Sequence, residues 1–231
     1  MMKMITYMKI KHHSIFNNLN KSTIDWESIR KDSSEKQYYL PQEKQEYIKE
    51  ANNSKAINKA NEVHFYLNRL NVDSIFSLGS GRAYLEYQLK QKGLNVDISD
   101  LDSSINLIAR FNIFDKVYQL SFEETMGHLK NYNGLVLLSR IDTEIDDLEL
   151  IRLFQNLSDN KVKYIYFIPA QLLTFKSFLI EIYIRLKSIL INKKLIFCGY
   201  SRTEKTFIKF WGKYYKIIAQ SNTKSYLLEL R

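Results

Sequence analysis

The stretch from Ser74 to Leu89, SIFSLGSGRAYLEYQL, constrains the fold more than any other part of this 231-residue chain. A run with strand character leads directly into Gly-Ser-Gly, and a helix-forming segment follows. Small residues let the backbone pass close to a ligand, and the first turn of a helix presents unpaired N–H groups at the positive end of its dipole. A strand, a glycine turn and a helix in this order therefore predict a turn that binds a cofactor.

An acidic residue follows at the spacing expected for a nucleoside. Asp100 ends a second strand-like run, NVDIS, about 20 residues after Gly79. A carboxylate in that place can accept hydrogen bonds from ribose hydroxyls. The glycine turn and Asp100 together indicate a nucleoside cofactor.

Details of the turn exclude two common nucleotide sites. The dinucleotide fingerprint needs a third small residue where this chain has Tyr84, whose ring would obstruct close packing of the helix on the strand. A P-loop needs Lys followed by Ser or Thr, whereas Arg82 and Ala83 follow Gly81 here. NAD binding and ATP hydrolysis are both disfavoured.

The segment Gly79-Ser80-Gly81-Arg82-Ala83 resembles the G-x-G-x-G motif of class I S-adenosylmethionine-dependent methyltransferases, with Ala83 in place of the last glycine. The resemblance implies an α/β fold: a Rossmann-like, mostly parallel sheet with helices on both faces and one antiparallel strand near the C-terminus. We expect a mostly helical or irregular extension at residues 1–54 and the methyltransferase domain at residues 55–231. The chain lacks an Asn-Pro-Pro-Tyr type signature, so N-methylation of bases is disfavoured.

Apolar runs alternating with amphipathic segments predict the elements of such a sheet. Strands are expected at 95–99, 116–120, 134–139, 163–168 and 195–200, and a C-terminal hairpin at 215–219 and 225–230. A helix is expected before the first strand, broken near residues 52–54.

The resemblance also implies which residues hold S-adenosylmethionine. In that family the glycine turn wraps the amino acid part of the cofactor, the acid after the second strand holds the ribose, and the loop after the third strand flanks the adenine. The cofactor-binding residues expected on this basis are Ser77, Gly79, Ser80, Gly81, Asp100, Leu101, Ser121, Phe122 and Ser139. Many members have an acid at the position of Ser77, so the grip on the cofactor's amino group must be weaker here or come from elsewhere.

The acceptor pocket of such a sheet lies outside the carboxyl ends of the strands. Candidate substrate-binding residues there are Arg140, Tyr200 and Arg202, because guanidinium groups can hold an anionic acceptor in a bidentate manner. Methyl transfer to a hydroxyl also needs a base near the proton. Asp142 and Glu144 are the acids within reach; Asp142 is the catalytic candidate, and capping of the next helix is its alternative role.

Charge and residue usage bound the partners and the compartment. With 34 Lys and Arg against 25 Asp and Glu, the formal charge of +9 favours acidic partners such as nucleic acid, anionic lipid or a phosphorylated sugar. A lysine-rich soluble surface explains the same charge, and no compact Arg-rich run with interleaved aromatics appears. The single Cys198 and the lack of an apolar signal segment favour the cytoplasm. The 4 histidines lack metal-ligand spacing, so no metal is expected.

A long helix expected from about Gln171 to Ile191 has a wide apolar face with basic residues beside it. Such a helix can cover a parallel sheet or lie on an anionic membrane, and sheet packing is favoured. Charged side chains interrupt the apolar run, so the helix cannot be a simple membrane span.

The resemblance implies a methyltransferase, and we expect O-methylation of a glycan or small-molecule acceptor. An RNA methyltransferase is the alternative within the class; the positive charge supports it and the missing RNA-binding module opposes it. A non-catalytic binding module with a relaxed cofactor site is the alternative from another class, indicated by Ser77 and Ala83.

Overall fold

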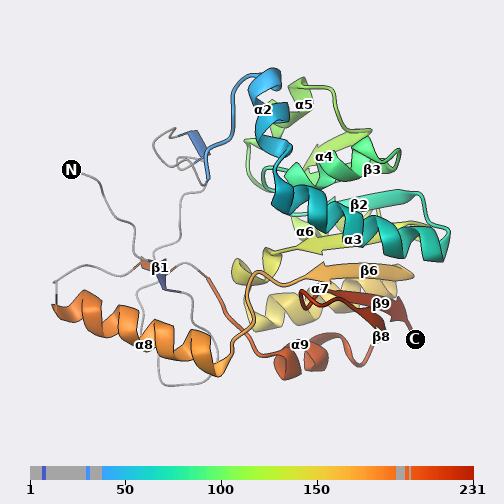
Figure 1. Cartoon of the computed structure of the whole chain (residues 1–231). Helices are drawn as coiled ribbons and strands as arrows, with labels where there is room; N and C mark the ends of the chain where they lie inside the picture. Colours follow the sequence, from blue (N-terminus) through green and yellow to red (C-terminus); the bar gives the residue numbers. More distant parts are fainter. Residues whose placement is uncertain (1–6, 9–29, 32–37, 191–195, 198) are drawn as a thin grey trace.

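A twisted sheet forms the centre of the molecule in the computed structural model, which describes residues 7–8, 30–31, 38–190, 196–197 and 199–231 (Figure 1). The strand order is β4-β3-β2-β5-β6-β9-β8. Strands β2 to β6 are parallel to one another, and β9 is antiparallel to both of its neighbours. The strands are β2 (Ser74–Leu78), β3 (Asn95–Asp100), β4 (Lys116–Gln119), β5 (Leu135–Ser139), β6 (Tyr164–Ile168), β8 (Tyr215–Gln220) and β9 (Tyr226–Leu230). The expected parallel sheet with one antiparallel strand near the C-terminus is confirmed.

Helices cover both faces of this sheet, because side chains of the central strands alternate between two apolar layers. In β2, Ile75 packs in the layer formed with α2, α3, α4 and α5, whereas Phe76 and Leu78 pack in the layer formed with α7 and α9. The helices are α2 (Lys44–Ala51), α3 (Ser54–Leu70), α4 (Tyr84–Gln91), α5 (Ile105–Arg110), α6 (Phe122–Met126), α7 (Asp147–Asp159), α8 (Phe175–Leu190) and α9 (Glu204–Trp211). Burial on both faces explains the nearly continuous apolar strands.

The helix before the first strand is broken where the sequence predicts it. Asn53 separates α2 from α3 and caps α3, because its side-chain oxygen accepts a hydrogen bond from the backbone N–H of Ala56 at 2.9 Å. Leu40 and Tyr47 are fully buried in the apolar layer that covers the sheet. The described end of the expected extension therefore packs on the core, and the domain boundary at residue 54 stays a prediction.

Tyr47 links α2 to the glycine turn. Its hydroxyl lies 3.0 Å from the carbonyl oxygen of Arg82 and 3.1 Å from that of Ala83, and it donates to this pair of acceptors. Burial and the nearby Glu86 raise the pKa of Tyr47 well above its usual value, so the hydroxyl keeps its proton. The turn is thus held from outside its own segment.

Two expectations for the C-terminal part are wrong. The strand expected at 195–200 is reduced to β7 (Ile196–Phe197), which pairs with β1 (Tyr7–Met8) in a separate two-stranded sheet; residues 195 and 198 lie outside the described part. The sequence reading also missed α9, which begins after the capping residue Thr203 and buries Phe207 and Trp211 against the sheet.

The expected packing of the long helix on the sheet is also wrong. Among the described residues α8 adjoins β1 and makes no comparable contact with any strand of the large sheet. Figure 1 shows α8 to one side of the layered core, while α7 and α9 lie beside the sheet. No helix in the described ranges has the length and apolar character needed to cross a bilayer.

Candidate functional site

A cleft of 1130 Å³ opens along the carboxyl ends of the parallel strands. Its walls come from the segments that follow β2, β3, β4 and β5, with further side chains from α3 and α7. Pockets for a single drug-sized ligand typically measure about 300–1,000 Å³, so this cleft can hold two small molecules side by side. Its position matches the switch region where ligands bind in open parallel sheets.

The glycine turn forms one wall and depends on left-handed backbone conformations. Gly79 has a φ of +65°, and a Cβ atom there would lie 2.6 Å from Cγ2 of Ile141. Gly81 and Ala83 have φ values of 58° and 52°. A glycine is therefore required at position 79 for conformation and space, and Ala83 adopts the left-handed conformation usually reserved for glycine.

Asp100 lies against this turn, as the sequence predicts. The backbone N–H of Gly81 donates to Oδ2 of Asp100 at 2.6 Å, and the N–H of Asp102 donates to Oδ1 at 2.9 Å. Ionised carboxylate oxygens have about four acceptor positions in total, so both oxygens can accept further bonds from a ligand in the cleft. Two segments separated in sequence thus form one polar wall.

The acid that Ser77 lacks is supplied by the next helix. Ser77 is fully buried and does not line the cleft, but its hydroxyl donates to Oε1 of Glu86 at 2.7 Å. Glu86 lies in the first turn of α4 and lines the cleft although its side chain is only 2% exposed. Burial raises the pKa of Glu86 to about 7, and the hydrogen bond from Ser77 opposes that rise. Ser77 thus positions a buried acid rather than contacting a ligand itself.

The other residues expected at the cofactor are placed around the same cleft. Leu101, Ser121, Phe122 and Ser139 all line it, together with Gly79, Ser80 and Gly81. Within the described part of the chain, Oγ of Ser80 is buried without a hydrogen-bond partner, which leaves it available to a polar ligand. Ser121 also caps α6, since its hydroxyl accepts from the N–H of Glu124 at 3.3 Å.

Asp142 does not occupy the position of a base. It is fully buried outside the cleft lining, and its Oδ1 accepts a hydrogen bond from the N–H of Ala170 at 2.9 Å. This contact joins the segments after β5 and β6. The cap of α7 is Asp146, whose Oδ1 accepts from the N–H of Glu149 at 2.9 Å. Both roles expected for Asp142 are therefore contradicted, because its carboxylate is used to connect two loops.

Arg202 is also a structural residue. Its fully buried guanidinium donates to Oδ1 of Asp147 at 2.8 Å, to the carbonyl of Ile145 at 2.7 Å and to the carbonyl of Asp142. The same group lies over the ring of Tyr200, at 5.0 Å from its centroid. Neither Arg202 nor Tyr200 lines the cleft. Their predicted contact with a substrate is therefore wrong in this structure.

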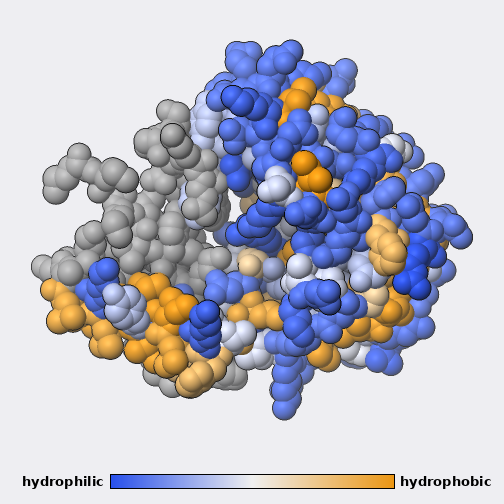
Figure 2. Space-filling model, viewed as in Figure 1, coloured by the Kyte–Doolittle hydropathy of each residue, from blue (hydrophilic) through white to orange (hydrophobic). Residues whose placement is uncertain are grey.

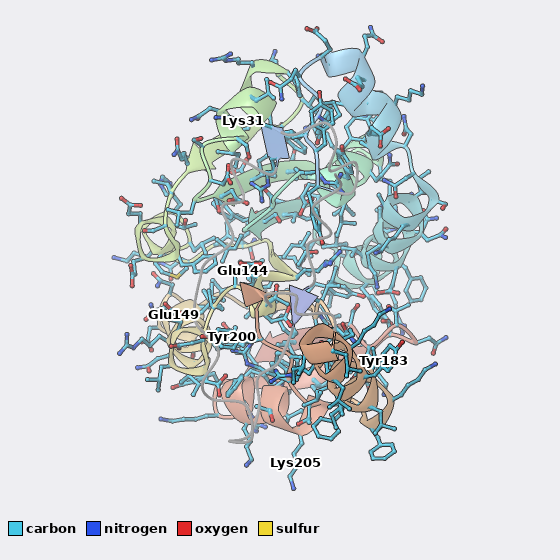
Figure 3. All side chains as sticks on the ribbon, turned by 90° about the vertical axis from the view of Figure 1, so that its left-hand side faces the viewer. Lys31, Glu144, Glu149, Tyr183, Tyr200 and Lys205 are labelled. Atoms are coloured by element: carbon cyan, nitrogen blue, oxygen red, sulfur yellow. The ribbon has the colours of Figure 1, made fainter. Side chains whose placement is uncertain are left out.

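Arg140 is the one predicted substrate-binding residue that lies in the cleft. It is exposed, follows β5 directly and has a φ of 64°. The acids Glu144 and Glu149 line the same part of the cleft, and Figure 3 shows both on the side that faces the viewer. Glu149 completes the α7 capping box through the N–H of Asp146 at 2.7 Å, whereas Oε1 of Glu144 accepts from the Thr143 hydroxyl at 3.3 Å. Glu144 is thus the better placed acid.

Sequence reasoning missed the basic residues at the mouth of the cleft. Arg30 and Lys59 line it from the N-terminal part of the chain and from α3. Arg30 forms an ion pair with Asp102 at 3.1 Å and donates to the Ser104 hydroxyl at 2.9 Å. Only the position of a helix before the first strand indicated such a contribution. Across the described ranges no group of three His, Cys, Asp or Glu side chains could hold a metal ion, and the expectation of no metal stays a prediction.

Comparison with solved structures shows the fold of class I S-adenosylmethionine-dependent methyltransferases. The PH0226 protein from Pyrococcus horikoshii OT3 is similar at a TM-score of 0.53 and 14% identity, over 78% of this chain and 93% of that one. Magnesium protoporphyrin IX methyltransferase from Synechocystis PCC 6803, crystallised with bound SAH, has a TM-score of 0.51 and 14% identity, over 75% and 81%.

The chain spans about half the length of human N-acetylserotonin methyltransferase, covering 47% of that chain with 68% of its own at 13% identity and a TM-score of 0.48. No family model matches this sequence. No curated protein matches it either.

Proposed function

We propose that this protein is an S-adenosylmethionine-dependent methyltransferase that methylates a hydroxyl of a glycan or small molecule. The observation that carries the proposal is the shared wall formed by the glycine turn, Asp100 and Glu86 at one end of the cleft. The similarly folded magnesium protoporphyrin IX methyltransferase, which was crystallised with bound SAH, supports the same ligand.

The residues of this wall fit the three parts of the cofactor. Asp100 accepts hydrogen bonds from the ribose hydroxyls, and Phe122 with Leu101 flanks the adenine. Glu86 binds the ammonium group of the amino acid part, and the partnerless Ser80 hydroxyl offers a further polar contact. Gly79 and Gly81 keep the backbone free of side chains where the ligand approaches it.

Positioning dominates the chemistry at the other end of the cleft. When bound, the cofactor supplies a methyl group already activated by a positive sulfur. The protein must hold the acceptor oxygen in line with that methyl group, and a base must take the hydroxyl proton. Glu144 is the base that we propose in place of Asp142, and Arg140 binds an anionic group on the acceptor.

The alternatives differ in how the structure supports them. The cleft favours a small acceptor over RNA, for which the formal charge of +9 is the remaining argument. The two signs of a relaxed cofactor site lose weight, because Ala83 adopts the required conformation and Ser77 supports Glu86. A catalytic site is therefore our conclusion.

Calorimetric titration with S-adenosylhomocysteine tests the cofactor site. We expect binding in the micromolar range, whereas NAD and ATP should not bind. Circular dichroism of the same preparation shows that the protein is folded. Folded protein that does not bind S-adenosylhomocysteine would move the non-catalytic alternative to the front.

Methyl transfer to a panel of saccharides, small hydroxyl compounds and bulk RNA then separates the acceptor classes. Glu144→Gln should lower the rate of transfer to a hydroxyl while leaving affinity for S-adenosylhomocysteine unchanged. Glu149→Gln is the matched control, since Glu149 lines the same cleft but is held in the capping box of α7.

A further inference from the structure

Helix α8 presents an apolar stripe to solvent that the fold leaves uncovered. Its five largest exposed side chains on one face are between 48% and 85% exposed: Phe175, Leu179, Tyr183, Leu186 and Leu190. They are spaced by three or four positions, so they share one face of the helix. Figure 2 shows this face as the apolar area over α8 at the lower left. A stripe of this size on one helix marks an interaction surface.

The charges beside the stripe are basic. Lys176 and Lys187 are exposed on the same side of α8, and Glu181, the single acid of the helix, is half-buried. A helix with an apolar face bordered by lysines complements a surface that is apolar below and negatively charged above. Anionic lipid headgroups over acyl chains have this arrangement.

We propose that α8 lies in the headgroup region of an anionic membrane, with the apolar stripe toward the acyl chains and Lys176 and Lys187 toward lipid phosphates. The helix has 16 residues and is too short to cross the bilayer, so it lies parallel to the surface. This arrangement accounts for both the missing sheet contacts and the sign of the neighbouring charges.

A second copy of the chain fits the stripe less well. Contact about a twofold axis with the two α8 helices antiparallel would place Lys176 near Lys187 of the partner, because these residues lie near opposite ends of α8. A parallel contact would place each lysine near its own copy. Like charges oppose both arrangements, whereas both lysines are favourable on anionic lipid.

The position of α8 relates the membrane to the cleft. The N–H of Leu173 donates to the carbonyl of Arg202 at 2.8 Å, and Leu172 pairs with Arg202 in a parallel bridge. These contacts hold the start of α8 at the carboxyl edge of the sheet, where the cleft also lies. If the proposed function holds, an acceptor carried at the lipid surface would be presented to this edge.

Flotation of the full chain with lipid vesicles tests the inference directly. We expect binding to vesicles that contain phosphatidylglycerol, little binding to pure phosphatidylcholine, and release from the anionic vesicles by high salt. Equal binding to both vesicle types, or no binding to either, would overturn the proposal. Affinity for S-adenosylhomocysteine is measured separately, so failure of the cofactor site would not be mistaken for failure of the membrane surface.

Paired variants separate the stripe from the general positive charge of the protein. Lys176→Glu with Lys187→Glu should weaken binding to anionic vesicles by roughly tenfold or more, since each basic residue near the surface contributes about 1 kcal/mol. Lys205→Glu with Lys209→Glu is the matched control on α9; Figure 3 shows Lys205 apart from Tyr183 of the stripe. Equal losses in both pairs would refute a specific role of α8.

A second pair tests the apolar part of the surface. Leu179→Ser with Leu186→Ser should abolish flotation, whereas Phe65→Ser, at an exposed position on α3, should leave it unchanged. Analytical ultracentrifugation of the wild type and the leucine variant distinguishes the other occupant. A wild-type dimer that the leucine substitutions dissociate would show that a second copy, and not a membrane, covers α8.

Discussion

The two ends of the cleft are built in different ways. At the cofactor end, the glycine turn and Asp100 meet through one backbone hydrogen bond between neighbouring strands, Gly81 N–H to Asp100 at 2.6 Å. At the acceptor end, the loops after β5 and β6 are joined by buried side chains, through Asp142 to Ala170 and through Arg202 to Asp142 and Ile145. Charged residues therefore face the ligand at one end and hold the framework at the other.

This difference teaches that the same residue type in the same kind of loop can have opposite roles. Asp100 and Asp142 both follow or end a central parallel strand, but Asp100 lines the cleft and Asp142 is fully buried. The number of backbone donors and acceptors that each loop leaves unpaired decides which role an acid takes. Variants on the two sides should accordingly differ in what they change, stability or ligand affinity.

The largest expected effect is on stability, at Arg202. Replacing it by Met leaves two buried carbonyl groups and Asp147 without their donor, so Arg202→Met should lower the free energy of unfolding by about 3–5 kcal/mol in urea denaturation. Arg140→Met, at an exposed position, should change it by less than about 0.5 kcal/mol. An Arg202→Met protein of normal stability that binds acceptor poorly would break the comparison.

The next effect is on affinity, at the glycine turn. Gly79→Val should weaken binding of S-adenosylhomocysteine by about 100-fold or more, because its Cβ would lie 2.6 Å from Ile141 and shift the turn. Gly93→Val is the control: Gly93 also has a positive φ, +83°, but a Cβ there meets nothing within 4 Å. Calorimetry in which both variants bind equally would mean that backbone strain alone matters.

Asp100→Ala should weaken the same ligand by roughly 10- to 100-fold, since it removes charge-assisted hydrogen bonds to the ribose. The substitution also removes the acceptor of the Gly81 N–H, so a thermal melt must accompany the titration. Full affinity in a folded variant would contradict the assignment of Asp100 and leave the ribose without its predicted partner.

The effect at Glu86 should depend on pH. Because its pKa is raised to about 7, Glu86 is mostly neutral at pH 6 and ionised at pH 8, so affinity for the ammonium of S-adenosylhomocysteine should rise about tenfold over that interval. Glu86→Gln should bind more weakly at pH 8 and show no such rise. Ser77→Asp combined with Glu86→Gln moves the carboxylate by one hydrogen-bond length and should restore binding.

Stability provides the control for this variant. A carboxyl group whose folded-state pKa is raised favours the folded protein less as pH rises from its unfolded value of 4.5 to about 7. Glu86→Gln should therefore gain stability relative to the wild type between pH 5 and pH 8. A difference in unfolding free energy that stays constant over that range would show that Glu86 does not titrate as described.

The sequence predicts the sheet and the cofactor end because both depend on local patterns. The apolar strands alternate with helices, and the glycine turn follows its strand within a few residues. The acceptor end could not be predicted, since the burial of Arg202 depends on the carbonyls of Asp142 and Ile145, about 60 positions earlier. Both α8 and α9 are amphipathic, and only the tertiary structure decides that α9 covers the sheet.

The contact of Tyr47 with the carbonyls of Arg82 and Ala83 makes α2 and the ligand-binding turn one cooperative unit. Ligand that rigidifies the turn should then slow amide hydrogen exchange in α2 as well, although α2 lies on the outer side of the turn. Tyr47→Phe removes the only covalent feature needed for this communication, a single hydroxyl, and keeps the ring in the core. In that variant, protection by ligand should stop at the turn.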